Sequence, residues 1–402
     1  VGTDRMRFVS LLGIGLIILA AYAVSERRDK APWRLVCMGL VLQAALGFLM
    51  LKTYPEHIFG AADGLFKAIQ RFSDIGARFL FGGLADQKDF VILSMASVII
   101  FVSSIMAVLN YLRVVPVVMF VFARMMQKTL RTSGAETLSA AMQILMGIEA
   151  MTALKTVLPR MTRSELFTVM SCFMATMAGS VMAVYVGVFG ANAGYILAAS
   201  VMSAPGAIVL SKMMVPETGT PETRGNMDWR MILPGDRGIV EAAANGAIDG
   251  LRLCAFIAAI LLAFVSIIHL MDALLGAAGL SFKAIGGAVL SPAAFLLGVP
   301  WEDCHKAGYL LTMKFVFNEW LSYSAMQQMI QHGELQPRTV MILTYAMCNF
   351  ANFGSVAILI GGIGALAPER RREVSLLGLR ALLTGLLCGF LSASIAGVLS
   401  QS

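Results

Sequence analysis

Long apolar runs recur along this chain of 402 residues and are separated by short loops rich in basic residues. Four of the clearest runs cover residues 8–24, 35–51, 90–112 and 253–268. Their lengths are close to or within the ~17–25 residues that a helix needs to cross about 30 Å of hydrocarbon. The pattern therefore predicts an all-α polytopic membrane protein.

Basic residues gather in four loops, at residues 27–34, 113–131, 212–237 and 370–372. Loops rich in Lys and Arg stay on the cytoplasmic side, so we expect all four there. Three apolar units lie in each of the two later intervals, and three crossings would place consecutive basic loops on opposite sides. One unit in each interval is therefore expected to enter and leave through the same face, as a re-entrant hairpin.

Polar or glycine interruptions mark one candidate hairpin in each interval. The first runs from about residue 136 to 159 and is interrupted near Gly147. The second runs from about residue 291 to 331 and contains Asn318 and Glu319. Non-helical backbone at membrane depth is tolerated only where protein or a water-filled cavity surrounds it, so both interruptions are expected inside the protein.

The segment after each hairpin supports an internal repeat. Thr162 and Glu165 have the spacing of a capping box, and Pro337 suits the first turn of a helix. Each helix then leads to a Gly-Ser-Val sequence, at 179–181 and at 354–356. Paired glycine-interrupted segments in corresponding halves are the best sequence indicator of a transporter's binding site.

Two further segments mix charged and apolar residues in a way typical of helices that lie at the membrane surface. They cover residues 61–87 and 116–131. We expect both to be interfacial helices rather than spans. The first apolar run lacks a clear small-residue cleavage site, so it is interpreted as a span and not as a signal peptide.

Composition narrows the class of protein. Hydrophobic residues make up 58% of the chain and charged residues only 14%, against about 25% in soluble domains. The formal net charge of +7 is spread over short loops, so we expect no nucleic-acid partner. The six cysteines and four histidines are scattered without metal-ligand spacing. We therefore expect no enzyme, no metal site and no cofactor.

Two carboxylates lie inside apolar segments, Glu149 and Glu319. A charge near the bilayer centre costs ~2.5–3.5 kcal/mol on insertion scales, so each needs compensation. Ion pairs with Lys155 and Lys314 are one explanation. The other is that each carboxylate accepts hydrogen bonds from a polar solute or carries a proton, since burial favours the protonated form.

A polar patch interrupts the apolar segment near residue 352. Asn352 and Ser355 are three residues apart, which predicts one helix face for both, and Phe350 and Phe353 lie in the same patch. These residues either bond neighbouring helices together or bind a solute with several hydroxyl groups. The aromatic rings are suited to stacking on a flat ring.

Seven sequence strings resemble those of concentrative nucleoside transporters. The strings are MTRSELF, MAGSVMA, LAASVMSAPGA, VPET, FNEW, FANFGS and LAPERR, between residues 161 and 371. The resemblance extends from the first span to the last. It implies a homotrimer in the bacterial inner membrane, with eight transmembrane helices, two re-entrant hairpins, interfacial helices and an inverted repeat. It also implies an elevator mechanism, in which a transport domain slides against a scaffold.

The resemblance implies a division of the chain. Residues 1–115 and 237–280 would belong to the scaffold, and residues 116–236 and 281–402 to the transport domain. It also implies that Glu319, Asn352 and Ser355 bind ribose, with Asn318 beside them in the same motif and Phe350 next to the substrate.

The first hairpin departs from the family pattern. The family usually has Gly-Gln-Thr-Glu, whose Gln and Thr contact the nucleobase. The aligned residues here are Met146, Gly147, Ile148 and Glu149. We expect a base pocket with fewer polar contacts and more volume, and hence an altered base preference.

The coupling-ion site departs as well. Met142 aligns with an Asn that coordinates sodium in the family, and a thioether is a poor ligand for a hard cation. Thr176 keeps a hydroxyl, and Leu145 and Met177 offer carbonyls. We expect proton coupling in preference to sodium, with Glu149 or Glu319 as carrier.

The sequence thus predicts ion-coupled import of nucleosides. The alternatives are transport of a modified nucleoside, a nucleobase or another small polar solute, and a membrane receptor that binds nucleosides without transporting them.

Overall fold

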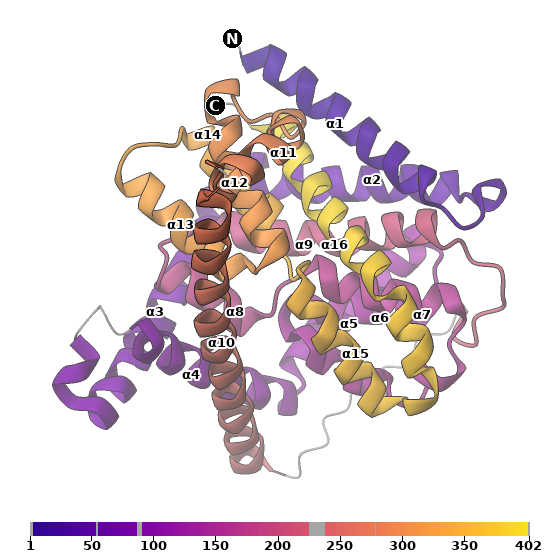
Figure 1. Ribbon diagram of the computed structural model, residues 1–402. Coiled ribbons are helices and arrows are strands. Elements are labelled where there is room, and N and C mark those ends of the chain that lie inside the picture. Colours follow the sequence, from indigo (N-terminus) through magenta and orange to yellow (C-terminus); the bar gives the residue numbers. More distant parts are fainter. Residues whose placement is uncertain (1–2, 54, 87–90, 225–237, 278, 401–402) are drawn as a thin grey trace.

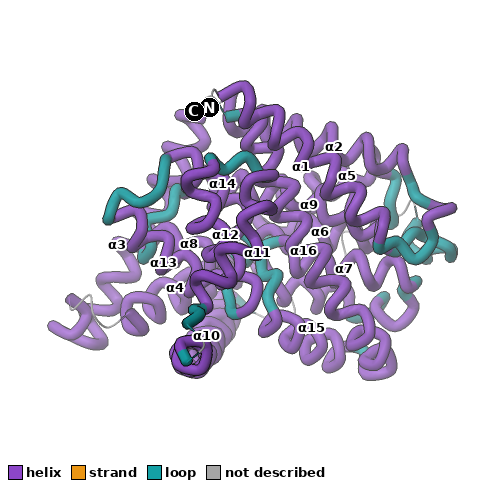
Figure 2. The backbone as a smooth tube through the Cα atoms, turned by 45° about the horizontal axis from the view of Figure 1, so that its top comes forward, coloured by secondary structure: helices purple, strands orange, loops and turns teal. Residues whose placement is uncertain are grey.

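The computed structural model describes residues 3–53, 55–86, 91–224, 238–277 and 279–400. Within these ranges the chain is helical and contains no β-strand, apart from one isolated bridge between Ser133 and Arg224. Figures 1 and 2 show the helices packed around one another, with the two ends of the chain close together. The predicted all-α class is confirmed.

The first five helices are α1 (Thr3–Ala23), α2 (Trp33–Phe48), α3 (Pro55–Phe81), α4 (Val91–Tyr111) and α5 (Val114–Leu130). They are followed by α6 (Gly134–Met146), the 3-10 segments η4 (Gly147–Leu154) and η5 (Leu158–Arg160), α7 (Arg163–Ala175), α8 (Gly179–Gly187) and α9 (Ala193–Met214). The last seven are α10 (Ile239–Gly276), α11 (Phe282–Leu296), α12 (Trp301–Val316), α13 (Glu319–Gln331), α14 (Pro337–Met347), α15 (Phe353–Leu366) and α16 (Arg371–Leu399).

The same order of elements occurs twice, in α4 to α9 and in α10 to α16. Each series has a long helix, a shorter second helix, a pair with a break, a second broken pair and a final long helix. This is the order that the predicted repeat requires, while its inverted orientation stays a prediction.

Six of the described helices are long and apolar enough to cross a membrane, or up to eight if each of two bent pairs is one span. The bends are 72° between the α4 and α5 helices and 117° between α11 and α12. The longest helix, α10, has 38 residues and a length of about 57 Å. It runs down the front of the molecule in Figure 1.

Both predicted hairpin interruptions are breaks in the helices. Gly147 ends α6 with φ 61° and ψ −135°, a conformation that glycine adopts without strain. The second interruption lies at Phe317 and Asn318, between α12 and α13. The predicted start of the second hairpin, near residue 291, is wrong because Ser291 belongs to α11. Gly298, with φ 97°, and Pro300 turn the chain before α12 begins.

The predicted helix starts are confirmed. The Thr162 side chain accepts a hydrogen bond from the Glu165 backbone N–H, and the Glu165 carboxylate accepts one from the Thr162 N–H. Pro337 occupies the first turn of α14. Ser133 and Glu136 form a second capping box at the start of α6.

Helix α3 covers most of the predicted amphipathic segment, with exposed charges at Lys67, Arg71 and Arg78 and an exposed Phe79. Helix α5 covers the other. It buries one face, including Met119 and Met126, and leaves the opposite face exposed. Their position at the membrane surface stays a prediction.

Small residues bring the long helices together. An added Cβ on Gly246 of α10 would lie 2.6 Å from the Ser103 carbonyl oxygen of α4, and one on Gly250 would lie 2.8 Å from the Ile100 Cα. Helices α1 and α2 pack mainly against α9 and α16 instead. These helices therefore form two packing groups, one of α4 with α10 and the other of α1 and α2 with α9 and α16.

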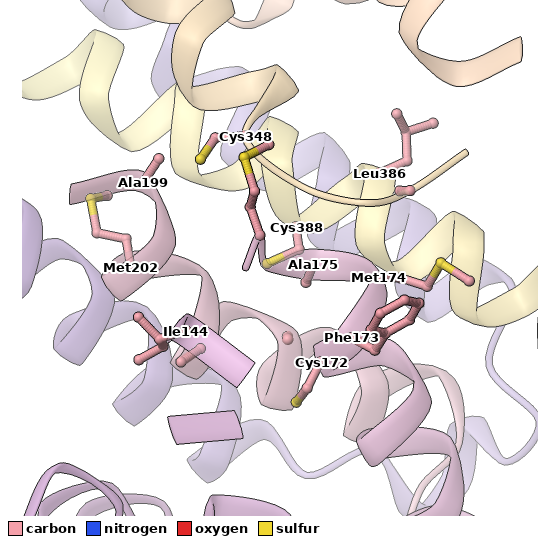
Figure 3. Close-up of a cluster of buried hydrophobic side chains, with 14 of the residues drawn as sticks. Ile144, Cys172, Phe173, Met174, Ala175, Ala199, Met202, Cys348, Leu386 and Cys388 are labelled. Atoms are coloured by element: carbon pink, nitrogen blue, oxygen red, sulfur yellow. The ribbon is translucent and has the colours of Figure 1, made fainter. Parts of the chain in front are cut away.

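The buried core is formed by α6, α7, α9, α14 and α16, part of which Figure 3 shows. On α16, Gly385 and Gly389 allow close approach. An added Cβ would lie 2.6 Å from Met174 Cβ of α7 and 2.3 Å from the Asn349 amide nitrogen, respectively. The break after α14 is thus packed directly against α16, with no space for a larger residue.

Candidate functional site

Glu319 is the first residue of α13 and is only 6% exposed. The preceding Asn318 is the N-cap, and its side-chain oxygen accepts a hydrogen bond from the Leu321 N–H at 3.0 Å. A carboxylate at a helix N-terminus is stabilised by the free N–H groups and the helix dipole. Asn318 therefore supports the start of α13, and Glu319 is left to face its neighbours.

Asn352 is the N-cap of α15, and both ends of its amide are engaged. Its oxygen accepts from the Ser355 N–H at 2.9 Å, and its nitrogen donates to the Glu319 carboxylate at 2.8 Å. The predicted helical face shared by Asn352 and Ser355 is corrected, because Asn352 precedes the helix and is joined to Ser355 by the capping bond. The N-termini of α13 and α15 thus converge on one carboxylate.

Aromatic side chains surround Glu319. Tyr185 lines the same pocket as the carboxylate. The Tyr185 ring stacks on Tyr323 with centroids 4.6 Å apart and lies 5.9 Å from Trp320. Sequence reasoning missed Tyr185 and Tyr323. The position of Tyr185 shortly after the first Gly-Ser-Val sequence was the only indication in the sequence that it lies near the site.

A narrow pocket opens beside this cluster. Its lining includes Glu319, Asn352 and Ser355 on one side and Leu253 and Phe256 of α10 on the other. The cavity holds about 70 Å³, whereas pockets for small molecules usually hold ~300–1,000 Å³. A solute larger than a few water molecules therefore enters only if α10 and the opposite wall separate or side chains move.

Phe350 connects the two helix breaks. Its backbone N–H donates to the Thr176 carbonyl at 3.2 Å, and its ring stacks on Phe173 with centroids 5.6 Å apart. Thr176 belongs to the break between α7 and α8, and Phe350 to the break between α14 and α15. Phe350 also lines the pocket, while its predicted contact with a substrate stays a prediction.

Lys314 of α12 does not form the ion pair with Glu319 that was one sequence-based explanation. Its buried ammonium donates to the Asn349 amide oxygen and to the Ala351 carbonyl, the latter at 2.8 Å. No ion pair within 4.0 Å joins Lys314 to Glu319 in the described part of the chain. The carboxylate is therefore compensated by hydrogen bonds and a helix N-terminus, and Lys314 acts on it electrostatically without direct contact.

The first hairpin is described only in part. Gly147 is buried and forms the break after α6. The side chains of Ile148 and Glu149 lie outside the described residues, so the predicted base contact and the role of Glu149 stay predictions. Lys155, the alternative partner of Glu149, is exposed.

The residues of the predicted cation site lie in α6 and in the break between α7 and α8. Met142, Thr176 and Met177 are buried, at 2%, 0% and 0% exposure. The Leu145 carbonyl lies 3.2 Å from the Cβ that Gly179 would carry. The Thr176 hydroxyl donates to the Cys172 carbonyl at 2.8 Å. Among the described residues, no group of three or more His, Cys, Asp or Glu is suited to a metal ion.

A second buried charge cluster escaped sequence reasoning. Lys212, expected in a basic loop, belongs to the last turn of α9 and pairs with Glu136 of α6. It also donates to the Ser164 hydroxyl at 2.8 Å and contacts Glu217 at 3.3 Å. Partial burial raises the pKa of Glu217, but Lys212, the Gly219 N–H and the Thr162 hydroxyl together hold it below its usual value.

A carboxylate and an amide at two broken helices, facing a pocket in an apolar helical protein, define a solute transporter. Three family descriptions match consecutive parts of the chain. "Na+ dependent nucleoside transporter N-terminus" matches residues 12–84, "Nucleoside recognition" 92–192 and "Na+ dependent nucleoside transporter C-terminus" 195–397. The chain belongs to the concentrative nucleoside transporter family, whose members are ion-coupled transporters and not enzymes.

Individual relatives match over nearly the whole chain. "Uncharacterized transporter YutK" of Bacillus subtilis (strain 168) is 38% identical over 96% of this chain and 98% of its own length. "Sodium/nucleoside cotransporter 1" of Rattus norvegicus is 36% identical over 98% of this chain, which spans 64% of that protein. The structure of CNTnw in an inward-facing substrate-bound state matches with a TM-score of 0.92 at 36% identity, covering 98% of both chains.

Proposed function

We propose that this protein imports nucleosides across a bacterial inner membrane by ion-coupled secondary active transport. The observation that carries the proposal is the buried hydrogen bond between Glu319 and Asn352, at 2.8 Å, in the pocket at the second helix break. Membership of a nucleoside transporter family supports the choice of substrate.

The chemistry of the pocket suits a ribose. A carboxylate accepts hydrogen bonds from two hydroxyl groups, and an amide both donates and accepts. We propose that the ribose hydroxyls form hydrogen bonds with Glu319 and Asn352 in place of the bond between these two residues, and that Ser355 offers a further hydrogen bond. A buried polar site rejects an analogue that lacks these hydroxyls, because its own groups are then left unpaired.

The base is proposed to lie against Phe350, whose ring lines the pocket and is held from behind by Phe173. An apolar wall with an aromatic ring accepts any flat base. Discrimination between bases would then depend on the first hairpin, where Gly147 and Ile148 stand in place of the family's Gln and Thr.

The elevator mechanism is supported by the position of the pocket between α10 and the broken helices. One group of helices carrying the breaks would slide past α4 and α10, which pack closely on each other. Helices α1 and α2 pack on α9 and α16, so we propose that these two helices move with the transport domain. Of residues 1–115, which were assigned to the scaffold, α4 then stays with the scaffold. The homotrimer, the eight spans and the re-entrant hairpins belong to the same proposal.

Proton coupling remains our proposal for the driving ion. It is supported by Met142, which is 2% exposed and places a thioether where the family has an amide. Glu319 is the proposed proton carrier among the described side chains. Sodium coupling is the alternative, because two of the matching family descriptions specify sodium.

The test is uridine uptake into proteoliposomes under an imposed pH gradient and, separately, an imposed sodium gradient. We expect uptake that responds to the pH gradient and collapses in Glu319→Ala, while Glu334→Ala, an exposed carboxylate after α13, leaves it unchanged. Full uptake by Glu319→Ala would remove the ribose assignment. Uptake that depends on sodium with no effect of pH would overturn the coupling proposal.

Competition by a panel of nucleosides, modified nucleosides and free bases against labelled uridine defines the substrate class. We expect nucleosides to compete and free bases to fail, since the polar site recognises ribose. Binding of labelled uridine without uptake or counterflow would indicate a receptor instead.

A further inference from the structure

Lys314 is a buried lysine whose hydrogen-bond partners are neutral, with Glu319 near enough to interact electrostatically but not in direct contact. Its side chain is fully buried on α12, five residues before Glu319. Its ammonium donates to the Asn349 amide oxygen and, at 2.8 Å, to the Ala351 carbonyl. Burying an ammonium costs several kcal/mol unless strong acceptors surround it, so losing either of these two hydrogen bonds would be strongly unfavourable.

Both acceptors lie in the break between α14 and α15. This segment, Cys348 to Asn352, has no helical hydrogen-bond ladder, and local bonds replace it. The Asn349 amide oxygen also accepts from the Ala351 N–H at 3.1 Å, and the Asn349 amide nitrogen donates to the Ala346 carbonyl at 3.0 Å. The lysine thus joins α12 to an unwound segment at two points.

The same segment determines where the binding groups lie. Asn352 follows Ala351 directly and starts α15, and its amide nitrogen reaches Glu319. Phe350, between the two acceptors, lines the pocket. A shift of the break by a fraction of an ångström would change the geometry of both. In the first half, α6 presents the buried Met142 and the Leu145 carbonyl near its break, and not a lysine.

We propose that Lys314 is a positioning residue of the nucleoside site, which clasps the break at Asn349 and Ala351 and so holds Asn352 against Glu319. The proposal rests on the proposed function for its substrate. It assigns to Lys314 no contact with the substrate. Its loss is expected to affect Asn352, and hence the ribose, more than Phe350 and the base, because the Thr176 carbonyl and the Phe173 ring also hold Phe350.

The experiment measures equilibrium binding of uridine and of 2′,3′-dideoxyuridine to the purified protein in lipid nanodiscs. Lys314→Met keeps the length of the side chain and removes the ammonium. We expect uridine to bind roughly tenfold or more weakly, and dideoxyuridine less than about twofold more weakly, because only the ribose hydroxyls depend on Asn352. The affinity ratio, which is the affinity for uridine divided by that for dideoxyuridine, should therefore fall. General destabilisation of the protein would not lower this ratio.

Two further variants keep the result interpretable. Lys314→Gln retains a donor without a buried charge and is expected to fold even if Lys314→Met does not. It should lower the affinity ratio by an intermediate factor. Lys306→Met, on the same helix but bonded to the Glu334 carbonyl at the surface, is the matched control and should leave the ratio unchanged.

A readout independent of nucleosides uses Cys348, which lies at the start of the break and is buried in the cluster of Figure 3. Labelling by a maleimide, mapped by mass spectrometry, should be faster at Cys348 in Lys314→Met than in the unchanged protein. The buried Cys172 should keep its rate.

An unchanged affinity ratio in both Lys314 variants overturns the proposal, whatever the labelling of Cys348. If the unchanged protein binds no nucleoside, the proposed function fails. The labelling then decides alone whether Lys314 holds the break, and equal rates at Cys348 would reject the clasp as well.

Discussion

Two buried lysines, Lys212 and Lys314, meet their nearby carboxylates in opposite ways. Lys212 pairs directly with Glu136, and the Ser164 hydroxyl and Glu217 complete its shell. Lys314 binds an amide and a carbonyl, and Glu319 binds Asn352 in the pocket. Both lysines and both carboxylates are at most 6% exposed.

We propose that this difference separates a carboxylate with a structural role, Glu136, from one that binds a solute, Glu319. Each oxygen of the Glu136 carboxylate has a partner within the protein, Lys212 on one and the Ser133 N–H on the other, which reduces its capacity to bind a solute. Where the lysine is diverted to neutral oxygens, the carboxylate keeps acceptor capacity that only a hydrogen-bond donor from a ligand can use. Burial alone therefore does not identify a binding carboxylate, and its partners have to be known.

The largest expected effect is on the structural pair. Lys212→Met leaves Glu136 as an uncompensated buried charge, which costs ~3–5 kcal/mol of the free energy of unfolding. Thermal melting in detergent should show the loss, with Lys155→Met, an exposed lysine, as control. Adding Glu136→Gln should recover more than half of it, because Gln still completes the capping box. A double variant no more stable than the single one would contradict this account.

The next effect tests the carboxylate that we propose binds the ribose. Glu319→Gln keeps the shape of the side chain and removes half of its acceptor capacity together with its charge. We expect kcat/KM for uridine to fall roughly 100-fold, or about 2.7 kcal/mol, with a change in melting temperature much smaller than that of Lys212→Met. Glu302→Gln, exposed on α12, is the control. A large loss of stability with normal uptake per folded protein would erase the distinction between the two lysines.

Local features of the sequence predicted much of this structure. Several features depend only on neighbouring residues, so they can be recognised from the order of residues alone. They are the apolar runs, the capping box at Thr162, the helix start at Pro337 and the break at Gly147. Glu319 was identified because a carboxylate in an apolar segment needs an explanation.

Long-range packing was not predictable in the same way. Lys212 looked like a loop residue because its partner Glu136 is 76 residues away in the chain. Tyr185 lines the same pocket as Glu319 only because α8 packs beside α13 in three dimensions. The start of α12 was misplaced because α11 and α12 are both apolar, and the turn between them depends on Gly298. Contacts of this kind leave no periodic pattern in the sequence.

A smaller effect concerns the packing behind Lys314. An alanine Cβ at position 389 would lie 2.3 Å from the Asn349 amide nitrogen and 2.6 Å from the Ala346 carbonyl oxygen. Gly389→Ala should therefore cost ~1–3 kcal/mol of stability, measured by thermal melting, and shift the break that Lys314 holds. Gly361→Ala on α15 meets nothing within 4 Å and should be neutral or slightly stabilising. Equal melting temperatures for the two variants would show that the break is loosely packed.

The smallest effect comes from a surface pair, which sharpens the contrast with both buried lysines. Glu26 accepts from Arg163 at 2.8 Å and also binds Arg380, and these arginines hold the pKa of Glu26 below its usual value although partial burial opposes them. A carboxylate with a lowered pKa contributes stability above its unfolded value of 4.5 and loses it as the pH falls through the folded value. Solvent limits this contribution to ~0.2–1 kcal/mol. The difference in melting temperature between the unchanged protein and Glu26→Gln should therefore be small at pH 7 and disappear in acid. A difference that persists unchanged below pH ~3, where the carboxyl is protonated in both states, would mean that Glu26 acts through shape and not through charge.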